Sequence, residues 1–292
     1  MSWRIVAITS RAKLDYKMNY LVVRTSEETK RININEISVL IIESTGVSLT
    51  AYLLSELIKS KVYVLFCDEK RLPQCELLPL YGCFDTSLKV RNQISWTKSA
   101  KGNIWAEIVR TKIIGQASVF SYSNQEEKAQ HLLGYASEIE PYDSTNREGH
   151  AAKVYFNALF GNDFSRSQEC NTNAALNYGY SIFLSAIARE IVVSGYINQI
   201  GIYHNNVHNP LNFACDLVEP FRPYVDNKVA HMDLAQFQHD EKMQLVNLLN
   251  LQVKIDGQLQ YMLFAIKTYA RSVFDALNEN DISKLKFPSY EL

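Results

Sequence analysis

The stretch Leu176–Gly195, LNYGYSIFLSAIAREIVVSG, determines how the second half of the chain is interpreted. Its large apolar residues recur every three or four positions, which places them on one face of an α-helix; they are Leu176, Tyr180, Phe183, Ile187 and Ile191. Gly195 is well placed to end this helix, because glycine readily adopts the left-handed conformation that commonly follows a helix. The pattern therefore predicts a helix that buries one face and ends near Gly195.

Two more stripes with the same period lie on either side of this stretch. The first consists of Trp105, Val109, Ile113, Ala117 and Phe120. The second, near the C-terminus, consists of Leu259, Met262, Leu263, Ile266, Ala270, Val273 and Leu277. We therefore expect residues 86–292 to form an all-helical domain, which is the larger of two.

The first 85 residues show a different pattern, that of a β-rich domain. Short apolar or alternating runs predict strands at 3–8, 20–24, 30–34, 39–42 and 62–66. The second and third of these runs flank a polar turn and resemble a hairpin. Leucines on one stripe predict a helix over residues 48–59. The chain is thus expected to be an α+β protein, with a small N-terminal sheet and one helix packed on it, followed by the helical domain.

The composition narrows the class of protein. The 292 residues carry a formal net charge of −1 and are 47% hydrophobic, which is enough for a substantial core. No apolar run approaches the ~18 residues of a membrane helix, and no secretory signal is visible. The five cysteines are odd in number and contain no Cys-x-x-Cys pair, so neither a disulfide framework nor a cysteine zinc site is indicated. We expect a cytoplasmic protein without membrane contact.

The charge is unevenly distributed along the chain. Residues 86–125 contain one acid, Glu107, and six cations: Lys89, Arg91, Lys98, Lys101, Arg110 and Lys112. Such a basic stretch on a nearly neutral protein is typical of a surface that binds phosphate. It is equally consistent with a solvated helix face, and charge alone leaves both interpretations open.

Phosphate-loop, dinucleotide-binding and nucleophile-elbow motifs are absent, which leaves two segments that could carry chemistry. The first is residues 145–156, TNREGHAAKVYF. Thr145 followed by Glu148 matches a capping box, in which Glu148 would only bond a backbone amide. Glu148 also falls on the apolar helix face of Ala151 and Tyr155, where a carboxylate is costly unless a cation meets it. Capping and chemistry both remain open for Glu148.

The second segment contains a histidine and two acids. His204 lies in an Asn-rich stretch, and Asp216 and Glu219 are three residues apart, a spacing that places them on one helix face. Pro220 cannot donate a helical hydrogen bond, so the helix is expected to kink or end at the acidic pair. His204 and His208 are spaced as in helical zinc sites, but no Glu follows His204, so the zinc-protease motif is not matched.

Together the two segments offer Glu148, His204 and Glu219, with Asp216 nearby. Carboxylates with one imidazole suit a hard divalent cation such as Mg²⁺ or Mn²⁺, and the imidazole favours Mn²⁺. Such an ion promotes phosphodiester chemistry, because it binds a phosphate oxygen and activates a hydroxyl nucleophile. The residues therefore suggest a metal site for phosphoryl transfer.

At these residues the sequence closely resembles the universal CRISPR-associated spacer-integration endonuclease, the integrase of CRISPR adaptation. The matching motifs are Glu148 to Ala152 (EGHAA) with Tyr155, Gly201 with His204, and Asp216 to Pro223 (DLVEPFRP). The likeness covers the whole chain. In the N-terminal half, residues 41–44 (IIES) and 66–70 (FCDEK) look like the branch that occurs with type II systems.

The resemblance implies a metal-dependent DNA integrase and nuclease. Its glutamate, histidine and second acidic ligand fall on Glu148, His204 and Glu219, as both metal ligands and catalytic residues, and Asp216 matches a further acidic position beside the metal. A homodimer is expected, because two joinings on opposite strands need two sites and each chain carries one. The resemblance also implies a small ferredoxin-fold CRISPR-associated partner protein that bridges two dimers. Other type II adaptation proteins are further expected partners.

The resulting hypothesis is that the protein joins the 3′-hydroxyl ends of short DNA fragments into a CRISPR repeat by transesterification. Residues 1–85 would serve as the dimer contact. DNA phosphates would be held by basic side chains, among them Lys89, Arg91, Lys112, Lys153 and Arg222. The alternatives are a noncatalytic DNA-binding scaffold and a general structure-specific repair nuclease.

Overall fold

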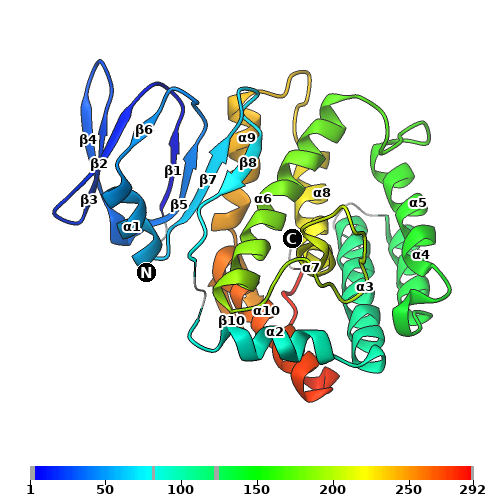
Figure 1. Cartoon of the computed structure of the whole chain (residues 1–292). Coiled ribbons are helices and arrows are strands. Elements are labelled where there is room, and N and C mark those ends of the chain that lie inside the picture. Colours follow the sequence, from blue (N-terminus) through cyan, green and yellow to red (C-terminus); the bar gives the residue numbers. More distant parts are fainter. Residues whose placement is uncertain (1–3, 81–82, 122–124, 291–292) are drawn as a thin grey trace. The chain divides into compact units, whose positions relative to one another are not determined.

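The computed structural model describes residues 4–80, 83–121 and 125–290. The chain divides into two compact units, residues 1–80 and 81–292. Figure 1 shows strands in the first unit and mainly helices in the second. The predicted order of a β-rich part followed by a larger helical part is confirmed. The sequence pattern changes at residue 85, and the first helix of the second unit, α2, begins at Thr86.

The β-rich unit contains two sheets, whereas the sequence indicated one. The first sheet has the order β1-β5-β7-β8, with the first three strands parallel. The second has the order β4-β3-β2-β6 and contains the predicted hairpin as β3 and β4. The strands are β1 (Arg4–Ile8), β2 (Lys13–Lys17), β3 (Tyr20–Arg24), β4 (Thr29–Asn33), β5 (Ile37–Ile42), β6 (Ser48–Leu49), β7 (Tyr63–Cys67) and β8 (Pro73–Glu76).

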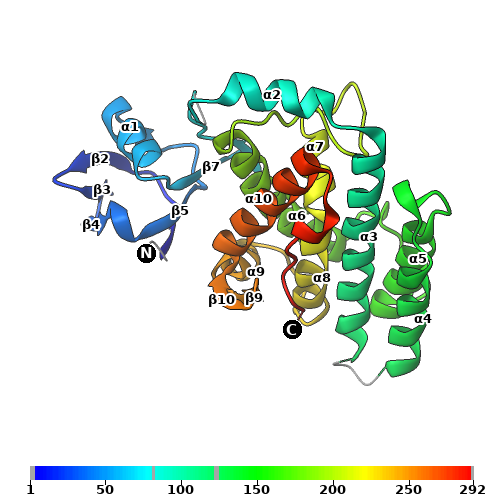
Figure 2. The same ribbon diagram turned by 90° about the horizontal axis from the view of Figure 1, so that it is seen from below.

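The predicted helix of this unit is α1 (Ala51–Lys59), which lies against β2 and β7 (Figure 2). It begins later than the apolar pattern indicated, because the hydroxyl of Thr50 accepts a hydrogen bond from the amide of Leu53 and caps the helix. Leu53 and Leu57 are completely buried and join Leu14 and Leu40 in the core of the unit.

The helical unit is organised around two long helices. Helix α6 packs against α7, α8, α9 and α10, and helix α3 packs against α4, α5, α8 and α10. Helices α3, α4 and α5 stand side by side in both ribbon views (Figures 1 and 2). The helices are α2 (Thr86–Ser95), α3 (Lys98–Ser121), α4 (Glu126–Ser137), α5 (Arg147–Phe160), α6 (Asn171–Val193), α7 (Asn212–Leu217), α8 (Arg222–Ala230), α9 (His239–Val246) and α10 (Met262–Glu279).

The apolar stripes of α3 and α6 are confirmed as buried faces. Helix α6 ends at Val193, and Gly195 follows with a φ of +89°, as its position predicted. The predicted C-terminal stripe included Leu259, which lies before the start of α10. Leu259 is exposed in a two-stranded hairpin formed by β9 (Gln252–Ile255) and β10 (Gln258–Tyr261), so the second unit is not entirely helical.

The five cysteines are free thiols; Cys67 is buried and Cys75 is exposed. Within residues 4–80, 83–121 and 125–290, no helix combines the length and apolar character needed to cross a membrane.

Candidate active site

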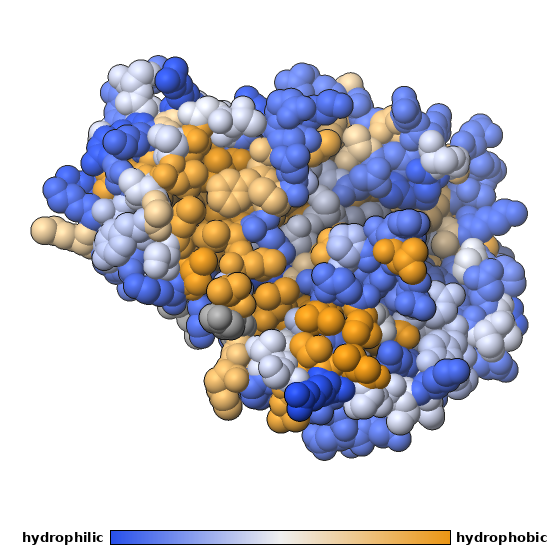
Figure 3. All heavy atoms as spheres, viewed as in Figure 1, coloured by the Kyte–Doolittle hydropathy of each residue, from blue (hydrophilic) through white to orange (hydrophobic). Residues whose placement is uncertain are grey.

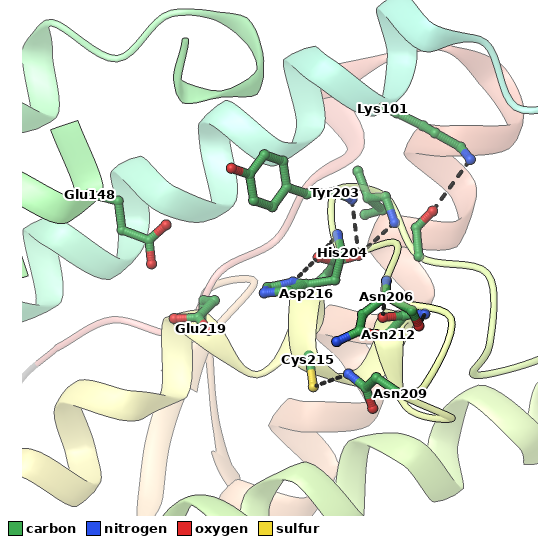
Figure 4. Close-up of polar contacts among 12 residues, drawn as sticks. Lys101, Glu148, Tyr203, His204, Asn206, Asn209, Asn212, Cys215, Asp216 and Glu219 are labelled. Atoms are coloured by element: carbon green, nitrogen blue, oxygen red, sulfur yellow. Dashed lines mark hydrogen bonds and ion pairs between the residues drawn. The ribbon is translucent and has the colours of Figure 1, made fainter. Parts of the chain in front are cut away.

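The structure brings together the four residues that the sequence singled out, all within the helical unit. Glu148 comes from α5, His204 from the loop between α6 and α7, Asp216 from α7, and Glu219 from the short 3₁₀ turn η3 (Glu219–Phe221) that follows α7. Figure 4 shows the carboxylates of Glu148 and Glu219 and the ring of His204 facing a common space. The two segments, which are far apart in the sequence, therefore form one site.

Pro220 interrupts the helix at the acidic pair, as predicted. Helix α7 ends at Leu217, the 3₁₀ turn contains Pro220, and α8 begins at Arg222. Asp216 and Glu219 are both almost completely buried. Because the break separates them, each binds a different set of partners, and their negative charges are balanced independently.

Asp216 organises the loop that carries His204. Its Oδ2 accepts hydrogen bonds from the amides of Ile202 (2.5 Å) and Tyr203 (3.1 Å), and its Oδ1 accepts from the amide of His204 (3.0 Å). The loop passes so close that a Cβ on Gly201 would lie 2.5 Å from Oδ2 of Asp216. Only glycine fits at residue 201 without displacing the carboxylate or the loop.

The ring of His204 is fixed from two directions. Its Nδ1 lies 2.6 Å from Oδ1 of Asp216. Since a carboxylate only accepts, Nδ1 carries the proton and Nε2 is left available to a ligand. On another side Trp105 of α3 meets His204 edge to face, and the same indole stacks on Tyr203 at a centroid distance of 4.5 Å. The loop is therefore preorganised.

The Asn-rich character of this loop has a structural explanation. The side chain of Asn212 accepts a hydrogen bond from the amide of Asn206 and donates to its carbonyl. Asn209 accepts from the amide of Leu211 and donates to the thiol of Cys215. His204 and His208 lie in irregular backbone, so they form no helical pair, and His208 is exposed.

A buried lysine joins the two glutamates. Nζ of Lys112, from α3, lies 2.5 Å from Oε1 of Glu148 and 2.5 Å from Oε2 of Glu219. Nε of Arg222 donates to the other carboxylate oxygen of Glu219 at 3.0 Å. Lys112 was predicted to hold a DNA phosphate, and that role stays a prediction. The residue is only 8% exposed and lies within the site, between the two glutamates.

The capping interpretation of Glu148 is contradicted by the geometry. Both oxygens of Asp143 accept hydrogen bonds from the first amides of α5, those of Arg147 (2.8 Å) and Glu148 (2.9 Å). Asp143 therefore caps this helix, and the Glu148 carboxylate is directed at Lys112. The adjacent Gly149 makes room for the side chain of Asn146, whose Oδ1 would lie 2.7 Å from a Cβ.

The ionisation of these groups follows from their partners. Burial by itself would raise the pKa of Glu219, but the charges of Arg222 and Lys112 lower it to about 2. Burial would lower the pKa of Lys112, and Glu219 and Glu148 raise it instead. The hydrogen bond to Asp216 raises the pKa of His204, and the negative charges of Glu219 and Glu148 add to this effect. The two glutamates are thus near enough to the imidazole to influence it.

A cavity of about 180 Å³ adjoins the carboxylates and is rich in cations. Three cations, Lys112, Arg166 and Arg222, line it together with Tyr180 and three acids, Glu148, Glu219 and Asp226. The guanidinium of Arg222 lies over the ring of Tyr180, 4.5 Å from its centroid. The hydroxyl of Tyr180 donates to Asp226, and burial raises the pKa of Asp226 to about 6. The cavity therefore offers positive groups to an anion beside the glutamates.

The other predicted DNA-binding residues lie outside this cluster, except for Arg222. Lys89 is partly buried on α2 and pairs with Asp85. Arg91 and Lys153 are exposed, on α2 and α5 respectively. A role for these three in binding phosphates remains a prediction.

The chemistry of these side chains suits a divalent ion, but the distances between them in this structure do not. Carboxylate oxygens and one imidazole nitrogen are ligands that Mg²⁺ and Mn²⁺ accept. Among the described residues, however, no three His, Cys, Asp or Glu side chains are close enough together to hold a metal ion. The ammonium of Lys112 lies between the carboxylates, so the site already stabilises positive charge at this point.

Several members of the site were not recognised from the sequence as parts of it: Asp143, Arg166, Tyr180 and Asp226. Lys112 did carry a signal, since it lies seven residues after Trp105 and three after Val109 and so falls on the buried stripe of α3. A lysine at a core position predicts a buried carboxylate partner. Asp143 and Asp226 showed no comparable pattern, because Asp143 accepts from the backbone amides that follow it and Asp226 accepts from the hydroxyl of Tyr180, 46 residues earlier.

Known proteins are similar to this chain in both sequence and fold. Residues 5–244 match the family model described as CRISPR associated protein Cas1. The CRISPR-associated endonuclease Cas1 of Neisseria meningitidis serogroup C (strain 8013) is 34% identical over 294 residues, which cover 99% of this chain and 96% of the relative. The CRISPR-associated endonuclease Cas1 1 of Francisella tularensis subsp. novicida (strain U112) is 23% identical and covers 82% of this chain and 83% of its own length.

Two solved structures support the fold. A casposase bound to integration product has a TM-score of 0.76 at 19% identity, covering 96% of this chain and 91% of the casposase chain. A Cas1 protein from Thermotoga maritima has a TM-score of 0.72 at 16% identity, covering 94% and 97% of the two chains. The resemblance noted in the sequence is therefore confirmed by the family model, the relatives and the fold. The chain belongs to the Cas1 family of CRISPR-associated proteins.

Proposed function

We propose that this protein is a divalent-metal-dependent DNA integrase and endonuclease of CRISPR adaptation. It would join the 3′-hydroxyl ends of short DNA fragments into the CRISPR repeat by transesterification. The observation that supports this most strongly is the convergence of Glu148, Glu219 and a preoriented His204 on one space beside a cation-lined cavity. The curated relative at 34% identity is named an endonuclease, which agrees with cleavage and joining of phosphodiesters.

Glu148, His204 and Glu219 would hold the Mg²⁺ or Mn²⁺ ion. When bound, the ion supplies a Lewis acid that polarises a phosphate oxygen and lowers the pKa of a hydroxyl nucleophile. Asp216 keeps Nδ1 of His204 protonated and so leaves Nε2 directed into the site. The hydrogen bonds that Asp216 accepts from three loop amides prevent the imidazole from moving away.

The cation-lined cavity would receive a phosphate of the DNA. Arg166 and Arg222 both line it, and Arg guanidinium groups bind phosphate oxygens in pairs of hydrogen bonds. Placed beside the glutamates, these cations would offset the charge that develops on the phosphorane oxygens as the 3′-oxygen attacks. Contacts of this kind position DNA without reading its sequence.

Two other functions are compatible with the same fold. A noncatalytic scaffold would bind branched DNA and form no product. A general repair nuclease would cleave branched DNA and join nothing. The buried carboxylates argue against the scaffold, because a protein without chemistry gains little from two such charges held together.

A strand-transfer assay separates the three. The protein is incubated with a short DNA duplex, a repeat-bearing plasmid, Mn²⁺ and candidate partner proteins. The proposal expects metal-dependent joined products. Cleavage without joining would favour the repair nuclease, and binding without any product would favour the scaffold.

The assembly we propose has at least two chains. Insertion joins one DNA end to each strand, and each chain contributes one candidate site, so two-fold symmetry is the simplest arrangement. The β-rich unit would form the dimer contact, since it exposes large apolar side chains, and apolar surface is visible in Figure 3. The exposed residues are Met18, Tyr20, Tyr52, Leu72 and Leu80.

The further partner would be a small ferredoxin-fold CRISPR-associated protein that bridges two dimers, alongside other type II adaptation proteins. A solved structure with a TM-score of 0.70 is a Cas6-RT-Cas1–Cas2 complex, so a chain of this fold does assemble with Cas2. Light scattering should show a dimer or larger. A mixture of wild-type and Glu148→Gln chains should accumulate products joined at one end. A strict monomer that completes both joinings would refute the dimer.

A further inference from the structure

The ammonium of Lys112 lies between the carboxylates of Glu148 and Glu219, so a metal ion would have to compete with it for their oxygens. Its side chain rises from the buried stripe of α3, and its ammonium lies 2.5 Å from an oxygen of Glu148 and 2.5 Å from an oxygen of Glu219. The Lys112 side chain is 10% exposed and that of Glu219 is 5% exposed. An ammonium so placed holds two carboxylates together that would otherwise repel each other at low dielectric.

The oxygens of Glu219 are both already engaged. Oε1 accepts from Arg222 and Oε2 meets Lys112. A divalent ion needs at least one of these oxygens, so one of the two cations has to leave. Arg222 is the less movable of the pair, because its guanidinium also rests on the ring of Tyr180. Lys112 has four rotatable side-chain bonds and makes point contacts, so it is the group that can withdraw.

The molecule provides a place for the displaced ammonium. The cavity of about 180 Å³ is lined by Lys112, Arg166 and Arg222 and by the acids Glu148, Glu219 and Asp226. When a divalent ion takes the oxygens of the two glutamates, these acids no longer balance all the positive charge, and an anion in the cavity restores the balance. A phosphate oxygen in the cavity would attract the ammonium of Lys112 away from the carboxylates.

We propose that Lys112 is an exchangeable internal cation, which holds Glu148 and Glu219 together in the absence of a divalent ion and yields their oxygens when the ion binds. It then turns to a phosphate in the adjoining cavity. This inference rests on the metal site of the proposed function and adds a competitor that regulates how readily the site is filled. In consequence the wild-type protein binds metal weakly until a phosphate draws the lysine away.

The test measures Mn²⁺ binding to the full-length, metal-stripped protein without DNA. Free Mn²⁺ is counted by electron paramagnetic resonance. Lys112→Met removes the charge and keeps the length of the side chain, and it should bind Mn²⁺ about tenfold more tightly than wild type or better. Lys98→Met is the matched control, because Lys98 is an exposed lysine at the start of the same helix. Its affinity should equal that of wild type.

A second measurement, thermal melting, tests whether the variant is folded. In EDTA, Lys112→Met should melt several degrees below wild type, because Glu148 and the buried Glu219 lose the ammonium that lies between them. Mn²⁺ should raise its melting temperature more than that of wild type. Should Lys112→Met fail to fold, Lys112→Gln retains a donor for the carboxylates and replaces it in both measurements.

The outcomes distinguish the inference from the proposed function. Unchanged or weaker Mn²⁺ binding in the folded Lys112 variant, with wild-type binding abolished by His204→Ala, overturns the role of Lys112 and leaves the metal site standing. Mn²⁺ binding that His204→Ala does not affect, or no binding by either protein, overturns both. Tighter binding by the Lys112 variant, with Lys98→Met unchanged, supports the exchange.

Discussion

The two halves of the candidate site are built by different kinds of interaction. In the imidazole half, Asp216 binds three backbone amides and the ring of His204. In the carboxylate half, Glu148 and Glu219 are held by the charged side chains of Lys112 and Arg222. Both halves bury acids, but only the first ties its acid to the backbone.

The difference separates geometry from charge. A carboxylate that satisfies backbone amides cannot change partners without unfolding the loop, so the imidazole half should be rigid and sensitive to truncation. A carboxylate that is neutralised by side chains can exchange one cation for another. The imidazole half therefore sets the position of a ligand, and the carboxylate half sets the charge that the site accepts.

The sharpest test of this contrast is Asp216→Ala. It leaves three loop amides and the ring nitrogen of His204 without their acceptor in a buried position, at a cost of about 3–5 kcal/mol in the free energy of unfolding. Strand transfer should be lost as well. Urea unfolding followed by tryptophan fluorescence reports on the loop directly, because Trp105 stacks on Tyr203. A loss below about 1 kcal/mol would remove the distinction between the two halves.

A pH effect is expected at Asp226, the buried acid on the wall of the cavity beside the carboxylate half. Its pKa is about 6 in the folded chain and about 3.9 when unfolded, so the folded protein retains a proton that the unfolded chain has released. This contribution favours folding below about pH 4 and is lost as the pH rises to about 6. Asp226→Asn has no ionisable group at this position, so it does not suffer this loss. As the pH rises from 4 to 7, the free energy of unfolding of Asp226→Asn should therefore increase by about 2–3 kcal/mol relative to that of wild type.

That comparison requires melting curves of both proteins at several pH values. If Asp226→Asn and wild type show parallel stability profiles, Asp226 is ionised throughout and its burial is fully compensated by Arg222 and Lys112.

The fold could be predicted where the pattern is long and local. The buried stripes of α3 and α6 follow directly from residue spacing, and the end of α7 shortly before Pro220 follows from the proline. The second sheet was missed because β2, KLDYK, is polar at most positions and buries only Leu14 deeply. The hairpin at residues 252–261 did carry a sequence signal, the Asp-Gly pair typical of tight two-residue turns, but the helical period of the neighbouring residues obscured it. In the structure Asp256 and Gly257 both have positive φ, as such a turn requires.

The site was predictable as a set of residues but not as a set of contacts. Glu148, His204, Asp216 and Glu219 do lie together, yet nothing in the local sequence paired Lys112 with the two glutamates. Such pairings depend on how α3, α5 and α8 pack, and residues 36 and 107 positions away in the chain meet only in three dimensions. The capping interpretation of Glu148 was likewise excluded by Asp143, a residue outside the capping motif.

A smaller effect on stability is expected from Glu148→Gln. The amide oxygen can still accept from Lys112, and Asp143 still caps α5, so the free energy of unfolding should fall by no more than about 1 kcal/mol. Strand transfer should be abolished, because the charge that a divalent ion needs is gone. Asp143→Ala should show the reverse, with about 1 kcal/mol lost from the cap and strand transfer retained. Retention of full activity by Glu148→Gln would exclude it as a ligand.

The smallest effect on stability should come from His204→Ala, which also tests whether the imidazole half has any purpose beyond structure. The ring is partly exposed, and Asp216 keeps its three amide partners without it, so the free energy of unfolding should change by less than about 1 kcal/mol. DNA affinity should also be unchanged, because it arises mainly from Lys and Arg at phosphates. Strand transfer should nevertheless be lost, since Nε2 is the metal ligand that we propose Asp216 to orient. Filter binding and strand transfer are measured on one preparation, with the exposed His208 of the same loop changed to Ala as the control. Equal activity in the two variants would mean that Asp216 holds the loop for a reason other than metal binding, and the imidazole half would then be purely structural.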